Sequence, residues 1–161
     1  MNYLEETEKA YLAGIVDTEC HLGITIKHQK TRRNPIYAPT LRLTMIDPEV
    51  VWWAHELTGL GSVHLLPRKP PCHDIWLWAV THRELEELLP EIEPYLLVKG
   101  ETARLILEFM GRLGSTKVKS NEEHQTRLDM VFRIRQLNQA NRLDKQQMRR
   151  EYSLVAQRQS A

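Results

Sequence analysis

The ten residues YLAGIVDTEC (11–20) form an apolar segment that closes on two carboxylates, Asp17 and Glu19. Glutamates within 5–8 lie at the start of the same helical pattern, where the helix dipole favours negative charge. Asp17 and Glu19 lie at its end, where each negative charge costs about 0.3–1 kcal/mol. Their position therefore indicates a role other than stabilising the helix.

Residues 4–18 predict a helix, because apolar side chains recur there at a spacing of 3.6. A second stripe of this helix carries small side chains at positions i, i+3, i+4 and i+7: Ala10, Ala13, Gly14 and Asp17. A face of nearly bare backbone allows another helix to approach closely. It equally allows the helix to lie flat on a sheet of its own domain, and the pattern alone favours neither arrangement.

Length and composition predict one ordinary globular domain spanning 1–161, with 42% apolar and 27% charged residues. No apolar run approaches the ~20 residues of a membrane span, so we expect no membrane partner. The first six residues are acidic and polar, unlike a signal or transit peptide. We therefore expect a protein of the cytoplasm or nucleoid of a prokaryote, or of an organelle that encodes it, and not a secreted one. Two cysteines make no disulfide framework.

From Cys20 the apolar period changes to two, which predicts a half-buried strand. A loop through 30–35 leads to a second alternating run, in which Leu41 and Leu43 point inward. The outward rows of these two strands carry hydrogen-bonding side chains: Thr25, Lys27 and Gln29 on the first, and Thr40, Arg42 and Thr44 on the second.

The remaining elements follow from capping and turn residues. Asp47 and Pro48 open a helix over about 48–58 that Gly59 ends. The next elements are a hairpin of 62–66 with 74–81, a helix from Thr81 to about Leu89 that Pro90 breaks or kinks, a helix at about 101–113, and a helix that begins at the capping box 120–123 and runs to about Asn138. The order is αββαββα followed by helices.

With these elements placed, LAGIVDTE (12–19) resembles the LAGLIDADG motif of homing endonucleases, and the αββαββα order from 4 to about 97 is that family's core. The segment PYLLVKG (94–100) resembles the one that carries the family's active-site lysine. The resemblance covers about 4–113 and implies an α+β fold with a DNA-binding antiparallel β-saddle. A C-terminal helical extension of about 114–161 follows.

The resemblance also implies an activity. The chain has one motif, so it would act as a homodimer with Ala10, Ala13 and Gly14 at the helix crossing and Asp17 at the interface. Such a dimer would be a site-specific double-stranded DNA endonuclease that hydrolyses phosphodiester bonds at a long, pseudo-palindromic target.

The same resemblance implies the catalytic groups. Glu19 matches the acid that binds metal, and Thr18 the position that contributes a backbone carbonyl. Two Glu19 side chains brought together would repel each other unless divalent cations, here Mg²⁺, are shared between the subunits. Lys99 would supply positive charge at the reacting phosphate.

The polar strand residues named above are the expected DNA-reading side chains, since a β-ribbon can enter the major groove. The second hairpin adds His64, Arg68, Asp74 and Trp76. Arg32 and Arg33, in the loop between the first two strands, are expected to contact phosphates, because half or more of protein–DNA hydrogen bonds go to the backbone.

Three departures from the family pattern leave a second hypothesis open. Glu19 replaces an aspartate, Cys20 and His21 replace small residues, and the polar residue expected near the end of the second strand falls within Met45-Ile46-Asp47. The alternative is an RNA-splicing maturase, with intron RNA as partner, or a cleavage-deficient DNA-binding protein of the same fold. A purely structural or protein-interaction domain would leave the acids at the helix end unexplained.

Overall fold

The computed structural model describes residues 1–27, 35–113, 120 and 122–140. Its elements, in chain order, are α1 (Glu6–Glu19), β1 (Cys20–Lys27), β2 (Ile36–Met45), α2 (Pro48–Thr58), β3 (Ser62–Leu66), β4 (Ile75–Thr81), α3 (His82–Ile92), the 3₁₀ turn η1 (Glu93–Tyr95), and α4 (Gly100–Leu113). A further helix spans 122–140 and is called the last helix below. No helix in these ranges is long and apolar enough to cross a membrane.

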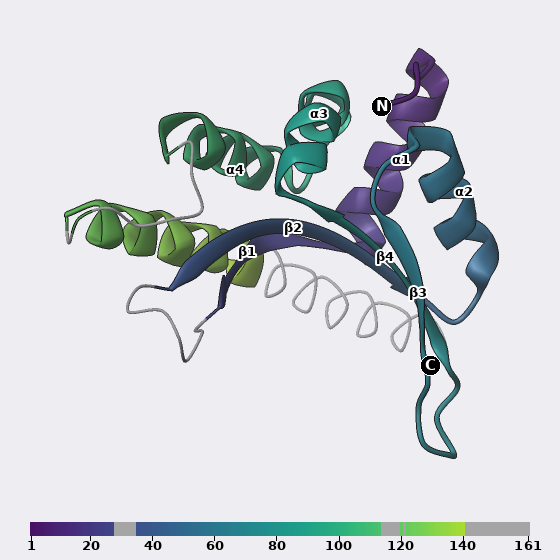
Figure 1. Cartoon of the computed structure of the whole chain (residues 1–161). Coiled ribbons are helices and arrows are strands. Elements are labelled where there is room, and N and C mark those ends of the chain that lie inside the picture. The colour runs from purple at the N-terminus through teal and green to yellow at the C-terminus, as the bar shows by residue number, and fades with distance from the viewer. Residues whose placement is uncertain (28–34, 114–119, 121, 141–161) are drawn as a thin grey trace, which may run out of the picture.

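The four strands form one antiparallel sheet in the order β1-β2-β4-β3. Figure 1 shows this sheet as an arch, with α1 to α4 over its outer side and the β3–β4 hairpin extending past the body of the molecule. The predicted αββαββα order and the α+β fold class are thus confirmed.

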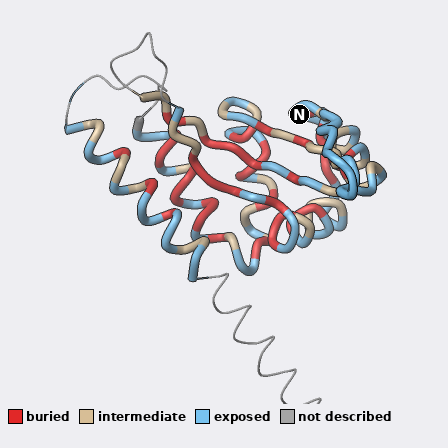
Figure 2. Tube along the Cα trace, turned by 90° about the horizontal axis from the view of Figure 1, so that it is seen from below, coloured by how far each residue is buried: buried red, intermediate tan, exposed pale blue. Residues whose placement is uncertain are grey.

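The core lies between the sheet and the helices. Register places Leu22, Leu41, Leu43, Trp78 and Val80 on one face, and all five are fully buried. Burying one such leucine or valine contributes on the order of 1.5–3 kcal/mol. In Figure 2 the buried residues follow the strands and the inward turns of the helices.

Local sequence signals explain most of the element boundaries. At α1, Glu5 and Glu8 form a reciprocal capping box, and the helix runs directly into β1. At α2, the Asp47 carboxylate accepts a hydrogen bond from the Glu49 amide at 2.9 Å, and Gly59 ends the helix with a φ of 64°. The boundaries of α2 agree with the predicted caps.

The predicted break at Pro90 is wrong, because α3 continues through this residue to Ile92. Proline removes only one backbone hydrogen bond when it stands in the last turn of a helix. Ile92 is fully buried, so continuing the helix places one more apolar side chain in the core. Burial therefore outweighs the local preference of the proline.

The last helix packs on α4 and on the β1–β2 side of the sheet. Val131 and Ile134 are buried, and the fully buried Arg127 guanidinium stacks over the rings of Tyr37 and Phe109 at 5.7 and 5.6 Å. Arg127 also pairs with Glu123 at 2.5 Å. These contacts attach the last helix to the core, which the sequence pattern did not indicate.

A glycine in the turn before β3 generates the first prediction. Gly61 has a φ of 78°, and a Cβ there would lie 2.6 Å from the carbonyl oxygen of Ala79. A residue other than glycine held in such a conformation costs of order 1–3 kcal/mol. Gly61→Ala should therefore lower the free energy of unfolding in urea by at least about 1 kcal/mol. Gly111→Ala, where a Cβ meets nothing within 4 Å, is the control and should be neutral or stabilising. Equal stability of both variants would contradict the described turn.

Candidate functional site

A cavity of about 600 Å³ opens at the C-terminal end of α1. Three parts of the chain that are far apart in the sequence line it. They are residues 17–22 at the α1–β1 junction, Val98 and Lys99 before α4, and Arg135, Asn138 and Gln139 of the last helix. Both acids of the opening motif thus lie in one cavity with the predicted lysine.

Asp17 connects α1 to the start of α4. Its side chain is only 5% exposed, and its two oxygens accept hydrogen bonds from the backbone amides of Leu97, Val98 and Lys99 at 2.7, 3.1 and 2.8 Å. Because α4 begins at Gly100, the carboxylate lies where the dipole of that helix favours negative charge. This bonding accounts for an acid that is unfavourable for α1 itself.

Lys99 makes the reverse contact, from the residue before α4 to the backbone at the end of α1. Its Nζ donates to the backbone carbonyls of Val16 and Asp17 at 2.7 and 2.5 Å. These carbonyls belong to the last turn of α1, where helical acceptors lack backbone donors and a cation is favourable. The lysine therefore lies beside the motif, although more than 80 residues separate it from Val16 in sequence.

Glu19 is the last residue of α1 and is exposed. Within the described residues its carboxylate makes no hydrogen bond or ion pair, so it can bind a cation. The Thr18 hydroxyl turns back to the Gly14 carbonyl at 2.8 Å. No group of three or more His, Cys, Asp or Glu side chains gathers around a common point in the described part of one protomer. A metal at Glu19 would thus take any further side-chain ligand of these types from a second chain, with backbone carbonyls, a nucleic acid or water completing its coordination.

The two residues after Glu19 point to opposite faces of β1. Cys20 is buried, and burial raises its pKa to about 12, so it remains a protonated thiol and a poor metal ligand. His21 lies on the polar face opposite Arg42. Burial, Arg42 and Lys99 all lower the pKa of His21, which keeps the imidazole neutral at physiological pH.

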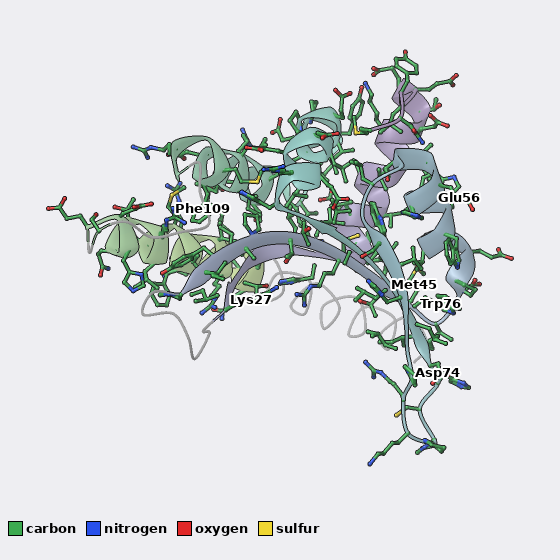
Figure 3. All side chains as sticks on the ribbon, viewed as in Figure 1. Lys27, Met45, Glu56, Asp74, Trp76 and Phe109 are labelled. Carbon is green, nitrogen blue, oxygen red and sulfur yellow. The ribbon has the colours of Figure 1, made fainter. Side chains whose placement is uncertain are left out.

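The polar face of the sheet points away from α1 to α4 (Figure 1). Register places Thr25, Lys27, Arg42, Thr44 and His64 on it, with Thr25 partly buried and the others exposed. Figure 3 shows Lys27 at the far end of β1 and Asp74 in the extended hairpin. The Asp74 carboxylate accepts from the backbone amide of Arg68 at 2.8 Å and so closes the hairpin loop. Gln29, Arg32 and Arg33 lie outside the described residues.

Two other candidates for DNA reading offer little surface on this face: Thr40 belongs to the same row as Arg42 and Thr44 but is buried, and Trp76 lies on the opposite side. Thr40 is 3% exposed at the centre of the sheet, between Gly23 and Thr81, and it offers little surface to a ligand. Trp76 pairs with Met45 and Leu65, which places it on the helix side, and its ring lies 6.1 Å from that of Trp52. Residues two apart on a strand point to the same face, so the buried Trp78 indicates that Trp76 also faces the helices.

Comparison with known proteins identifies the architecture. No protein-family model and no curated protein matches this chain. The solved structure of the homing endonuclease I-CvuI in complex with a DNA target matches with a TM-score of 0.70 and 20% identity, covering 82% of each chain. An archaeal intron-encoded homing endonuclease complexed with DNA matches at 0.70 and 16%, covering 83% of this chain and 86% of that one. The LAGLIDADG homing endonuclease I-GzeII matches at 0.60 and 17%, covering 79% and 43%.

The chain has the LAGLIDADG homing endonuclease fold. Within this fold the motif helix α1 exposes a stripe on its outer side: Ala10, Tyr11, Gly14 and Thr18. Ala13 is fully buried in its own chain, so it packs inside the protomer and not on this stripe. Asp17 is likewise occupied by its own chain. The exposed small residues of the motif helix are therefore Ala10 and Gly14.

Sequence reasoning missed the residues of the last helix that line the cavity of this LAGLIDADG fold. Arg135 and Gln139 are four residues apart and both exposed, as on any solvated helix face. Nothing in that spacing separates a ligand-facing pair from a solvated one. Only the tertiary contact between the last helix and β1 makes the difference.

The connection made by Asp17 generates the second prediction. Asp17→Asn replaces one acceptor oxygen by an NH₂ donor facing backbone donors, and each donor left unpaired costs about 1–3 kcal/mol. The variant should unfold at clearly lower urea concentration than the wild-type protein. Asp129→Asn, an exposed acid that accepts from Gln125, is the matched control and should change little. Equal midpoints for the two variants would show that the hydrogen bonds of Asp17 contribute nothing.

Proposed function

We propose that this protein is a site-specific double-stranded DNA endonuclease that acts as a homodimer with divalent metal. The observation that carries the proposal is the exposed Glu19 carboxylate at the tip of α1, in one cavity with Lys99 and next to the polar face of the sheet. The matched structures of the same fold are homing endonucleases in complex with DNA, which supports DNA as the partner.

A homodimer is supported by the match lengths and by α1. The alignment covers most of I-CvuI but less than half of I-GzeII, so this chain corresponds to one unit of the longer protein. Ala10 and Gly14 give α1 an exposed surface that a second helix can approach closely. A two-fold axis there would bring two Glu19 side chains together and would require a pseudo-palindromic target.

The residues present fit a hard divalent cation at the dimer axis. Each protomer offers one open carboxylate, and Mg²⁺ prefers oxygen ligands while keeping several waters. The Glu19 carboxylates of both protomers and the Thr18 carbonyl would hold it. When bound, such a cation lowers the pKa of a bound water and stabilises the leaving oxygen of a phosphodiester. Lys99 anchors the end of α1 that carries Glu19 and adds positive charge to the cavity.

The polar face would read the DNA. Its exposed side chains include Lys27, Arg42, Thr44 and His64, which supply donors to base edges and phosphates. We keep Gln29, Arg32 and Arg33 as proposed contacts in the connection between β1 and β2. Arg68 and Asp74 would lie at the far end of the target, in the β3–β4 hairpin.

One observation favours the alternative, a DNA-binding protein or maturase that no longer cuts. At the end of β2, Ile46 is 62% exposed, and the Asp47 carboxylate is occupied in capping α2. The one polar side chain of the stretch 45–47 thus serves as the cap of α2 through its Oδ1. Cleavage assays distinguish this alternative directly.

The first test replaces the proposed metal ligand. Glu19→Gln keeps the size of the side chain and removes its charge, so DNA cleavage in Mg²⁺ should be abolished while binding to the selected site changes by less than about tenfold, or 1.4 kcal/mol. The site is obtained by selection from a random duplex library. Glu56→Gln, an exposed glutamate of α2, is the control and should cut normally. Continued cutting by Glu19→Gln would remove Glu19 from the mechanism, and specific binding without cutting by the wild-type protein would favour the alternative.

The second test concerns the dimer. A Cβ at Gly14 meets nothing within 4 Å, and Gly14 is exposed, so Gly14→Leu should fold normally and yet prevent close approach of two α1 helices. Sedimentation velocity should show a monomer for this variant and a dimer for the wild-type protein. Gly111→Leu, at another open helical glycine, should remain dimeric. A dimeric Gly14→Leu would exclude α1 as the interface.

A further inference from the structure

The last helix contributes a wall to the cavity that holds Glu19 and Lys99. Arg135, Asn138 and Gln139 line this cavity together with the end of α1. In the chain these residues are more than 110 positions from the motif, and neither the motif nor the αββαββα core includes them. The C-terminal extension therefore has a place at the candidate active site.

Packing fixes the position of this wall. The Asn138 amide donates to the Leu22 carbonyl at 3.0 Å, and its oxygen accepts from the Thr102 hydroxyl at 3.4 Å. The helix comes close to β1 at Gly23, where an added Cβ would lie 3.9 Å from Asn138 and 3.2 Å from His21. One turn before Asn138, Arg135 thus has a defined position relative to the sheet.

Arg135 differs from the other two arginines of the last helix in that no carboxylate of the described residues pairs with it. Arg127 pairs with Glu123 at 2.5 Å, and Arg133 pairs with Glu101 at 3.3 Å. Arg135 is exposed and makes no hydrogen bond or ion pair with the described residues. A guanidinium without a carboxylate partner is a ready binding group for a phosphate, which it contacts through two parallel donors.

Asp17 and Lys99, the other charged residues beside Glu19 in the cavity, are already hydrogen-bonded to the backbone, so Arg135 is the group that can bind a phosphate. Asp17 is buried and bonded to three backbone amides, and the Lys99 amine is directed at two carbonyls of α1. The cavity thus presents one open acid, Glu19, and one open guanidinium, Arg135. An acid that holds a cation and a guanidinium that holds an anion are complementary to a phosphodiester with its metal.

We propose that Arg135 binds the phosphodiester group at the site of cleavage and stabilises the negative charge that develops on it, so that the last helix forms part of the active site. This inference rests on the proposed function. Gln139, one turn further on the same face, adds a hydrogen-bonding amide beside it. Because the contact is to the DNA backbone, Arg135 contributes to rate and affinity and not to sequence preference.

The experiment compares Arg135→Met with Arg133→Met, since both remove one exposed guanidinium from the same helix and only the first lines the cavity. Single-turnover cleavage of the selected site in Mg²⁺ should slow about 10²-fold for Arg135→Met, as for loss of one transition-state donor, and should stay near wild type for Arg133→Met. Arg135→Lys, which keeps the charge, should recover part of the loss. Thermal unfolding by circular dichroism checks that all three variants fold.

Binding gives a readout that does not depend on cutting. The affinity for a mixed-sequence duplex is measured at several salt concentrations and plotted as log affinity against log salt. Arg135→Met should reduce the magnitude of the slope by about 1, because one phosphate contact is lost. Arg133→Met should leave the slope unchanged. A wild-type slope together with a wild-type cleavage rate for Arg135→Met would overturn this inference and leave the proposed function standing. A wild-type protein that binds no duplex DNA would overturn both.

Discussion

The carboxylate of Asp17 and the amine of Lys99 hold together two helix ends that are distant in sequence. Three backbone amides donate to the carboxylate, and two backbone carbonyls accept from the amine. Hydrogen bonds to charged groups contribute about 1.5–3 kcal/mol each, so this small set is among the strongest local interactions that the fold offers. Glu19 follows Asp17 by two residues, and its direction depends on this connection.

The connection also explains why one acid of the motif is buried and the other is open. Asp17 satisfies the amides that precede α4, where negative charge is favourable, and so it stabilises the protomer. Glu19 is the last residue of α1, and its exposed side chain lies at the cavity. The two acids share a sequence motif but meet different physical requirements, and only Glu19 is open to a ligand.

Sequence reasoning predicted the elements whose causes are local. The capping residues Asp47 and Gly59 and the alternation that begins at Cys20 mark boundaries that the structure reproduces. The error concerns tertiary burial, because the continuation of α3 past Pro90 depends on Ile92 reaching the core. Of the site, Glu19 and Lys99 could be found through the resemblance, whereas Arg135 could not, because its place depends on how the last helix packs against β1.

No loop separates α1 from β1, which fixes the distance between Glu19 and the far end of β1. Glu19 ends the helix and Cys20 begins the strand, so the proposed cutting group and the reading surface are parts of one continuous rigid segment. The seven steps from Cys20 to Lys27 span roughly 23 Å at about 3.3 Å per residue. This length corresponds to about seven base-pair steps of ~3.4 Å along a duplex. In the proposed two-fold dimer, the distance from the symmetry axis to the last base that β1 is proposed to read would be set by the length of a strand, and changing the recognised bases would leave the position of the proposed cut unchanged.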